Sequence, residues 1–497
     1  MLVTCRQMQE MESRAFASGL DAADLMEQAG QGIARVVHQF FPAAGTLILY
    51  LGSGNNAGDA LVAARELQGD GWDVKIRASV PLDEMKPLPK KHWRSLGRAE
   101  VLESAPTAMS RTPIVLLDGL VGIGARGPLR PRLRELAAEM NSLRPRSGAQ
   151  TVAIDIPSGL DGDAGIPEAD CVMADITATI AVPKLGLLAD SAIRHVGRLA
   201  LVPLPSLVAF AEGESLDSSD LITPSQLRPW LPRRAFDMHK GQAGRVGIMA
   251  GSRGYFGAAQ LACHAALRAG AGLVTLLVKP DAYDILAQRV PAEVMVKPVK
   301  DYREALDLRF DALAIGPGLG LTYQDEYLDV IQQSTVPMLL DADALTALAS
   351  HPEILSKVQA PCLLTPHPGE MARLMPEGGV LSRADQAETW AQAHLQQTLL
   401  LKGSRTVIAH AGEHTRFNTT GHPGMATGGM GDVLTGVCAA LLGQGLTTYH
   451  TAALGAWLCG RAAEIHALSQ AQESTLPTDV IQCLGQAWQG IVTGEVF

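Results

Sequence analysis

The chain has 497 residues, too many for one ordinary domain, so at about 150 residues per domain we expect two or three domains. Apolar residues make up 47% of the sequence and charged residues 19%, which favours a compact globular α/β protein over a disordered one. The net charge of −10 and the lack of Lys/Arg clusters argue against a nucleic-acid partner or an anionic membrane surface. Without a long apolar run or an export signal, we expect a cytoplasmic protein with no membrane partner.

The first half begins with apolar residues at helical spacing over 7–41, around a short break. A buried strand is predicted at 46–51, followed by a turn of Gly, Asn and Asp residues at 52–59 and then a helix. Strand, glycine turn and helix is the setting in which a helix N-terminus holds the phosphates of a dinucleotide. The next strand, 73–79, ends without the acid that binds a ribose 2′-hydroxyl, so this is not a standard NAD-redox site.

Polar side chains follow three predicted strands of this half. Asn56 and Asp59 follow the first strand, Asp118 ends the third, and Asp155 and Ser158 follow the fourth. Because ligands bind at the carboxyl ends of parallel strands, one pocket that collects all these residues is predicted. An aspartate that caps a turn explains each of them singly, but explains the three sets together poorly.

This half resembles the YjeF family of NAD(P)H-hydrate epimerases in four segments, which stand here at 52–60, 118–124, 155–159 and 179–184. The resemblance covers about residues 7–205 and implies a Rossmann-like three-layer αβα domain, which we place at 1–213. It implies that this domain binds NAD(P)H hydrate and interconverts its R and S epimers, with K+ nearby. By the same resemblance, the substrate-binding residues are Asn55, Asn56, Ala57, Gly58, Asp59, Gly122, Ile123, Gly124, Ala125, Arg126, Gly127, Pro128 and Asp155, and the K+ ligands are Asn56, Asp118 and Ser158.

Three departures from the family pattern leave a second interpretation open. Ala57 and Ala60 replace glycines, and Gly119 opens a segment where the family has Ala-Leu-Phe-Gly-Thr. A module that binds the dinucleotide without exchanging epimers therefore remains an alternative. Lys184, after Pro183 at a strand end, is either an acid/base group or phosphate contact, or a salt-bridged surface lysine.

The second half follows a polar, acidic stretch that places the domain boundary near 205–222. Most of its predicted strands are followed by turn residues and then a helix, which is the pattern of a doubly wound parallel sheet. These strands are expected at 245–249, 273–278, 312–315, 338–340, 362–365 and 398–401.

The segment 427–436 has three glycines within four positions and leads into an apolar helical run from Val433. The glycines predict a loop whose N–H groups, with the positive end of the next helix, hold an anion. Asp432 stands at the start of that helix. A carboxylate in an anion site is costly unless it has chemistry to do, such as taking a proton from a hydroxyl that attacks a phosphoryl group; helix capping is the alternative.

This half resembles the ribokinase-like fold, and within it the ADP- or ATP-dependent NAD(P)H-hydrate dehydratases. The matching segments are 251–257, 269–272, 316–320, 341–343, 366–370, 402–406 and 428–436. The resemblance implies a domain at 222–497 that dehydrates the S epimer to NAD(P)H while ADP, held with Mg2+, is hydrolysed to AMP and phosphate. It implies Asp432 as the catalytic base, a substrate site of Phe256, Gly318, His367 and Asp432, and a nucleotide site of Lys402, Gly403, Ser404, Arg405, Thr406 and Gly431.

Some interpretations stay open at this stage. Glu370 is an indirect metal contact or a helix cap, and His367 is a donor to the substrate or a turn filler. His410, His414 and His422 look like a metal cluster, but alternation over 407–417 predicts a β-hairpin, and we expect no zinc. A ribokinase-like vitamin kinase is the alternative function, and we expect a homo-oligomer, a tetramer or larger.

Overall fold

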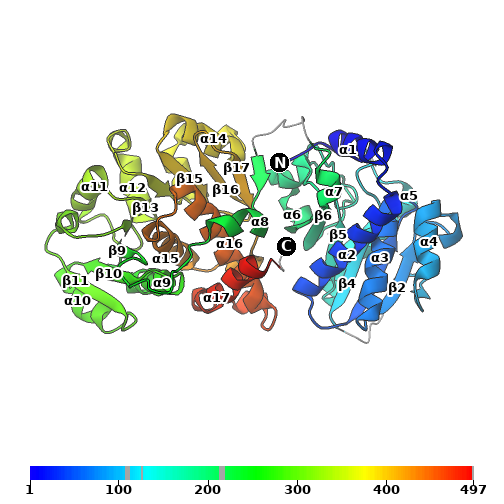
Figure 1. Ribbon diagram of the computed structural model, residues 1–497, viewed down its shortest axis with the longest axis horizontal. Coiled ribbons are helices and arrows are strands. Elements are labelled where there is room, and N and C mark those ends of the chain that lie inside the picture. The colour runs from blue at the N-terminus through cyan, green and yellow to red at the C-terminus, as the bar shows by residue number, and fades with distance from the viewer. Residues whose placement is uncertain (107–111, 125–126, 212–218, 495–497) are drawn as a thin grey trace. The chain divides into compact units, whose positions relative to one another are not determined.

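The computed structural model describes residues 1–106, 112–124, 127–211 and 219–494. The chain forms two compact units, Met1–Leu221 and the segment from Ile222 onward, and both are α/β (Figure 1). Among the described residues, no helix has the length and apolar character needed to cross a membrane.

The first unit is built on a seven-stranded parallel sheet with the strand order β3-β2-β1-β4-β5-β6-β7. Its strands are β1 (Thr46–Leu51), β2 (Asp73–Ala78), β3 (Glu100–Val101), β4 (Ile114–Gly119), β5 (Gln150–Ile154), β6 (Ile176–Ile180) and β7 (Arg198–Val202). Its helices are α1 (Cys5–Ala17), α2 (Ala22–Phe40), α3 (Asn55–Gly69), α4 (Pro87–Ser95), α5 (Pro131–Ser147), α6 (Ile193–Val196) and α7 (Pro205–Val208).

The interior strand β1 shows why this unit has three layers. All six of its residues are buried, and successive side chains point to opposite faces of the sheet. Leu47 and Leu49 pack in the core shared with α2 and α3, whereas Ile48 and Tyr50 pack in the core shared with α5. A strand buried on both faces has no polar alternation, and the predicted αβα arrangement is confirmed.

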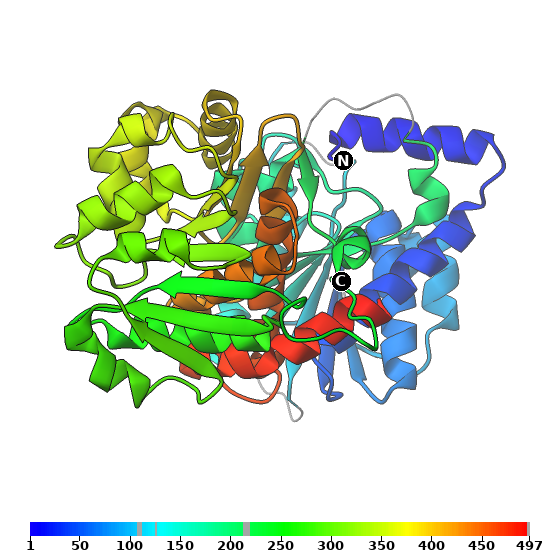
Figure 2. The same ribbon diagram turned by 60° about the vertical axis from the view of Figure 1, so that its left-hand side comes forward.

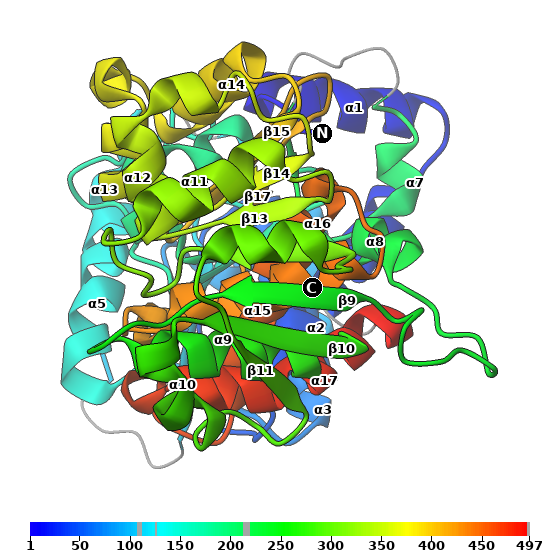
Figure 3. The same ribbon diagram turned by 90° about the vertical axis from the view of Figure 1, so that its left-hand side faces the viewer.

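The second unit has a ten-stranded sheet with the order β11-β10-β9-β12-β13-β14-β15-β16-β17-β8. The strands of this sheet are β8 (Ser219–Leu221), β9 (Arg245–Met249), β10 (Leu273–Val278), β11 (Val294–Pro298), β12 (Ala312–Ile315), β13 (Met338–Leu340), β14 (Cys362–Leu364), β15 (Gln397–Leu401), β16 (Thr406–His410) and β17 (Thr415–Asn418). Its edge strand β8 comes from the last three residues before the division of the chain at Ile222. From β11 to β15 the pairing is parallel, and Figure 3 shows β9, β10 and β11 running side by side.

The helices of the second unit are α8 (Pro224–Leu227), α9 (Phe256–Arg268), α10 (Pro280–Ala287), α11 (Gln324–Gln333), α12 (Asp343–Ser350), α13 (Pro368–Leu374), α14 (Arg383–Ala393), α15 (Met430–Gly443), α16 (Thr448–Ala467) and α17 (Pro477–Thr493). Helices α15, α16 and α17, orange to red in Figure 2, pack with α9 around a large apolar core. Helix α15 contacts β9, β12 and β13, so its first turn is fixed relative to the ends of these strands.

The structure corrects two boundaries expected from the sequence. Helix α3 begins at Asn55 and α15 at Met430, so both glycine-rich segments run into their helices earlier than predicted. The parallel pairing ends at β15, because β15, β16 and β17 pair antiparallel. The hairpin predicted over 407–417 is confirmed.

Candidate active sites

Three residues predicted to bind K+ lie together at the edge of the first sheet. Asp118 ends β4 and is fully buried, with Ser158 Oγ donating to its Oδ1 at 2.7 Å and Ser158 N donating to its Oδ2 at 2.8 Å. Asn56, in the first turn of α3, donates through Nδ2 to the carbonyl of Val121 at 3.1 Å, and Val121 N donates to Ser158 Oγ at 3.0 Å. Burial raises the pKa of Asp118 to about 6, since three hydrogen bonds from Ser158 and Leu120 only partly offset the lost hydration.

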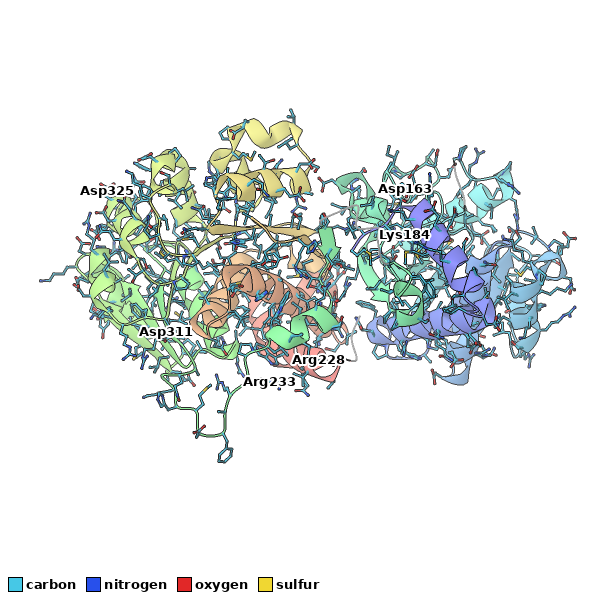
Figure 4. All side chains as sticks on the ribbon, turned by 45° about the horizontal axis from the view of Figure 1, so that its top comes forward. Asp163, Lys184, Arg228, Arg233, Asp311 and Asp325 are labelled. Atoms are coloured by element: carbon cyan, nitrogen blue, oxygen red, sulfur yellow. The ribbon has the colours of Figure 1, made fainter. Side chains whose placement is uncertain are left out.

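Asp155 follows β5 in a left-handed backbone conformation, with φ of 64°. Its carboxylate accepts from Ile180 N at 3.0 Å and forms an ion pair with Lys184, whose side chain is 0% exposed (Figure 4). The interpretation of Lys184 as a surface lysine is therefore wrong. A buried ammonium needs this partner, and the ammonium also donates to the carbonyl of Ile180 at 3.1 Å.

Asp59 is a second carboxylate in the same region, 9% exposed and without a hydrogen-bond partner in the part of the chain that the structure describes. Burial raises its pKa well above the ordinary value, and the charges of Asp155 and Glu12 add to this effect. A buried carboxylate without a donor is costly in a folded protein. This environment is typical of a carboxyl that binds a ligand.

The other predicted substrate residues of this unit divide into inward- and outward-facing groups. Ala57 belongs to the apolar core, and a Cβ at Gly58 would lie 2.4 Å from the sulfur of Met26, so these two residues offer a ligand only their backbone. Asn55, Gly124, Gly127 and Pro128 are exposed, and Gly122 lies against the side chain of Asn56. Ala125 and Arg126 lie outside the described residues.

Ala60 and Gly119 are in contact, although they depart from the family pattern in two separate segments. A Cβ built at Gly119 would lie 2.9 Å from the Cβ of Ala60 and 3.2 Å from the carbonyl oxygen of Asn56. The family pattern has Gly where this chain has Ala60, and Ala where this chain has Gly119. This chain therefore carries one methyl group on the helix instead of one on the strand, at the same contact. The exchange keeps the local volume and leaves Asn56 in place.

The second unit gathers its predicted site residues at one edge of the sheet, because β9, β12, β13, β14 and β15 are parallel. Asp341, which follows β13, is 2% exposed and accepts from Lys402 Nζ at 2.7 Å and from Thr435 Oγ1 at 2.9 Å. Gly431 stands directly over this pair, since a Cβ there would lie 3.5 Å from Lys402 Nζ and 3.6 Å from Asp341 Oδ2. Both residues lie in segments that match the dehydratases, 341–343 and 428–436, but neither was assigned a role in the site from the sequence.

Asp432 occupies the first turn of α15, where the backbone N–H groups are unpaired within the helix. The N-cap is Gly429, with φ of 98°, and among the described residues the Asp432 carboxyl has no hydrogen-bond partner. The capping interpretation of Asp432 is therefore wrong. Burial and then the charge of Asp341 raise its pKa to about 6, with Lys402 acting in the opposite direction.

Lys402 links Asp341 to a second carboxyl, Glu370, whose Oε2 lies 3.9 Å from Lys402 Nζ. Burial by itself lowers the pKa of Lys402, but Asp341 and Glu370 raise it above the ordinary value, so its ammonium stays charged. Burial raises the pKa of Glu370, and Lys402 works against that shift. A cation between two carboxyls, next to an anion-binding helix start, is suited to a phosphate group.

His367 and Glu370 form the capping box of α13. The Nδ1 atom of His367 accepts from Gly369 N at 2.9 Å, and Glu370 Oε2 accepts from His367 N at 2.8 Å. The capping role expected for Glu370 is confirmed, and His367 is an N-cap whose ring is half-exposed instead of a turn filler.

The remaining predicted residues surround this centre. Phe256 begins α9, and a Cβ at Gly318 would lie 2.7 Å from the Cβ of Tyr255, so these two segments touch. In the nucleotide segment, Gly403 and Ser404 are exposed, Thr406 begins β16, and the Arg405 side chain is 2% exposed and turned inward. Arg383 Nη2 donates to the carbonyls of Leu401 at 3.1 Å and Lys402 at 2.9 Å, and so fixes the start of this segment.

Two α/β units, each with buried acidic groups and a lysine at the carboxyl ends of parallel strands, define a two-domain enzyme with two separate centres. Comparison with known proteins identifies the family. A model of the YjeF-related protein N-terminus matches residues 22–186, and a model of NAD(P)H-hydrate dehydratase matches residues 246–486. The chain belongs to the family of bifunctional NAD(P)H-hydrate repair enzymes.

The relatives cover nearly the whole chain. The bifunctional NAD(P)H-hydrate repair enzyme of Moorella thermoacetica is 35% identical, over 97% of this chain and 96% of its own length. The enzyme of the same description from Escherichia coli is 34% identical, over 96% of this chain and 91% of its own. A crystal structure of the ADP/ATP-dependent NAD(P)H-hydrate dehydratase from Bacillus subtilis, co-crystallized with ATP/Mg2+, is 29% identical with a TM-score of 0.48, over 55% of this chain and 98% of its own.

Proposed function

We propose that the first unit, assigned to residues 1–213, exchanges the R and S epimers of NAD(P)H hydrate. We further propose that the second unit, assigned to 222–497, dehydrates the S epimer to NAD(P)H while ADP is converted to AMP and phosphate. Family membership supports the pairing of these two reactions on one chain. The vitamin-kinase alternative has no comparable support, because the model that matches the second unit is that of NAD(P)H-hydrate dehydratase and the nearly full-length relatives are bifunctional NAD(P)H-hydrate repair enzymes.

The observation that carries the dehydratase assignment is the environment of Asp432. Its carboxyl is unpartnered among the described residues, stands in the first turn of α15, and has a pKa of about 6. A base with such a pKa is ionised at neutral pH, yet basic enough to take a proton as a hydroxyl attacks a phosphoryl group. The N–H groups from Gly429 to Asp432 and the ammonium of Lys402 would stabilise the charge on that group.

Asp432 therefore takes the proton of the hydrate's hydroxyl, whose oxygen then attacks the terminal phosphate of the nucleotide. AMP departs as the hydrate's oxygen bonds to that phosphorus, phosphate then leaves with the oxygen, and loss of a proton from the adjacent ring carbon restores the ring double bond. We assign nucleotide contacts to Lys402, Gly403, Ser404, Arg405, Thr406 and Gly431, and substrate contacts to Phe256, Gly318 and His367. Arg405 would contribute through its backbone, because its side chain is buried.

Mg2+ on the nucleotide fits this centre. Glu370 is the nearby carboxyl with an oxygen, Oε1, that is not used in the helix cap, and it would face the ion directly or through water. The ion would neutralise the phosphate charge during transfer. We keep ADP over ATP as the expected nucleotide.

The donor set around Asp118 fits K+ at the first site. It consists of oxygen atoms, namely the buried Asp118 carboxylate, Ser158 Oγ and the side-chain oxygen of Asn56, which a hard cation prefers. The ion would offset the cost of burying Asp118. The substrate would then lie against Asn55–Asp59, Gly122–Pro128 and Asp155.

The test is to incubate a mixed R/S NADH hydrate with the protein, ADP and Mg2+ and follow the return of reduced-nicotinamide absorbance. Full recovery is expected if both units are active, whereas recovery that stalls at the S fraction would leave the first unit as a binding module. No recovery, with ATP consumed on another alcohol, would replace the assignment by a kinase. Light scattering and cell fractionation test the homo-oligomer and the cytoplasmic location, which stay predictions.

A further inference from the structure

Helix α1 carries a partly exposed carboxyl, Glu12, next to the residues of its buried face. Met8 and Ala15 are 2% and 0% exposed and pack in an apolar cluster with Ala181 and Val182. Glu12 lies four residues after Met8 and three before Ala15, so it shares their face of the helix. Its carboxyl is only partly exposed and, within the described part of the chain, has no hydrogen-bond partner. Such a position is costly for an acid unless a ligand or a reaction uses it.

The contacts of α1 place this face over the first site. Before the helix, Val3 pairs with Lys184, with Val3 N donating to the carbonyl of Pro183 at 3.1 Å. Within the helix, Gln9 Nε2 donates to the carbonyl of Ile123 at 3.3 Å, in the segment assigned to the substrate. One short element therefore runs from the buried lysine, labelled in Figure 4, to the substrate loop.

The charges that face Glu12 are those of the same centre. Burial and then the Asp155 carboxylate raise the pKa of Glu12, while the ammonium of Lys184 lowers it. The charge of Glu12 in turn raises the pKa of Asp59. The charges of the three carboxyls and of Lys184 therefore act on one another within one region. Asp155 has hydrogen-bond donors there, whereas Glu12 and Asp59 have none among the described residues.

The reaction assigned to this unit needs an acid and a base at one carbon. Water that adds to an enamine double bond leaves its hydroxyl on the carbon next to nitrogen, so the R and S hydrates differ at that carbon. For inversion, an acid protonates the hydroxyl, the C–O bond breaks, and the nitrogen lone pair forms a C=N bond as water leaves. Water then adds to the other face, and a base takes its proton, so no other reactant is needed.

We propose that Glu12 is a catalytic residue of epimer exchange, donating the proton to the departing hydroxyl while Asp155, paired with Lys184, accepts the proton from the incoming water. The inference rests on the proposed function of the first unit. Return of the proton from Asp155 to Glu12 through the exchanging water restores both groups. The match to the family model begins at residue 22, after α1.

The test compares Glu12→Gln, which keeps the shape but cannot donate and regain a proton, with Glu10→Gln on the same helix. The Glu10 side chain is 45% exposed and, among the residues that the structure describes, forms an ion pair with Arg6 alone, so its variant is the matched control. With a mixed hydrate, the fast phase reports dehydration of the S fraction and the slow phase reports epimer exchange. We expect Glu12→Gln to lower kcat of the slow phase by about 100-fold or more, with the fast phase and the KM for the hydrate nearly unchanged. Glu10→Gln should match the parent protein.

A second pair of measurements separates catalysis from packing. Glu12→Asp should retain part of the exchange activity, and formate should restore activity to Glu12→Ala, because a small acid can occupy the space left by the carboxyl. Normal exchange in Glu12→Gln would overturn the inference while leaving the epimerase assignment intact. Loss that formate does not rescue, or that appears wholly in KM, would make Glu12 structural. Absence of the slow phase in the parent protein would instead refute the proposed function of the first unit.

Discussion

Because Ala60 and Gly119 are in contact, we predict that substitutions at these two positions have non-additive effects on the free energy of unfolding. In Gly119→Ala, the new Cβ would lie 2.9 Å from the Ala60 Cβ, against about 3.5–4.0 Å for an unstrained carbon contact. Overpacking of this kind costs about 1–3 kcal/mol of unfolding free energy. Because Gly119 also lies against the carbonyl of Asn56, the strain would reach the residues proposed to bind K+ and substrate, and epimer exchange should weaken with stability.

The reverse change should repair the damage. Ala60→Gly alone removes a fully buried methyl group and places glycine in a helix, which together cost about 2 kcal/mol. In the double variant the methyl group returns to the strand, so the loss should be smaller than the sum of the single losses by about 1–3 kcal/mol. Urea unfolding of the full chain, followed by fluorescence, measures all three free energies.

Ala64→Gly supplies the control for this double-mutant cycle of Gly119→Ala and Ala60→Gly. Ala64 is also fully buried on α3, one turn further along, and is not among the atoms nearest to a Cβ at Gly119. Combined with Gly119→Ala, it should give an additive loss. Equal coupling in both cycles, or none in either, would refute the view that the two departures compensate each other across one contact.

Four further predictions concern the charged groups. Asp432→Asn should abolish dehydration of the S epimer and leave R/S exchange intact, as measured by absorbance recovery and by chromatography of the two epimers. Because the raised pKa of Asp432 is about 6, kcat/KM of dehydration should fall tenfold per pH unit below that value as the base takes up a proton; a flat profile from pH 5 to 7 would refute its role. Lys184→Met leaves the Asp155 carboxylate buried and unpaired, so unfolding free energy should drop by about 3–5 kcal/mol, with Lys75→Met, on a partly exposed pair, as the control. Asp118→Asn should remove any dependence of epimer exchange on K+, tested by replacing K+ with choline.

Strand positions were predictable from the sequence because parallel strands buried on both faces are short, uninterrupted apolar runs. The strands at 46–51, 245–249 and 273–278 lie where they were expected. Helix starts were harder, because Gly, Asn and Asp favour turns and yet are tolerated in the first turn of a helix, where N–H groups have no partner within the helix. Asn55–Asp59 and Gly431 are therefore helical despite their turn-like composition.

The local sequence pattern could not predict which side chains the site residues contact. Lys184 was open to interpretation as a surface residue because nothing near it in the chain indicates that Asp155, 29 positions earlier, lies against it. Asp341 and Thr435 are 94 positions apart, and only the packing of α15 against β13 brings them together. Such contacts are set by the fold, which local propensity does not encode.

Glu12 is different, because a local signal for it exists in the sequence. The face that holds Met8, Met11 and Ala15 is mostly apolar, and an acid beside those residues interrupts the amphipathic pattern. An isolated break of this kind is expected at a site where function overrides folding preference. The same reasoning applies to Asp59, which occupies the buried side of α3 among alanine and leucine residues. Two pattern-breaking carboxyls on two helices of the first unit, each with a pKa raised by burial and by the charge of Asp155, support the proposal that this centre moves protons.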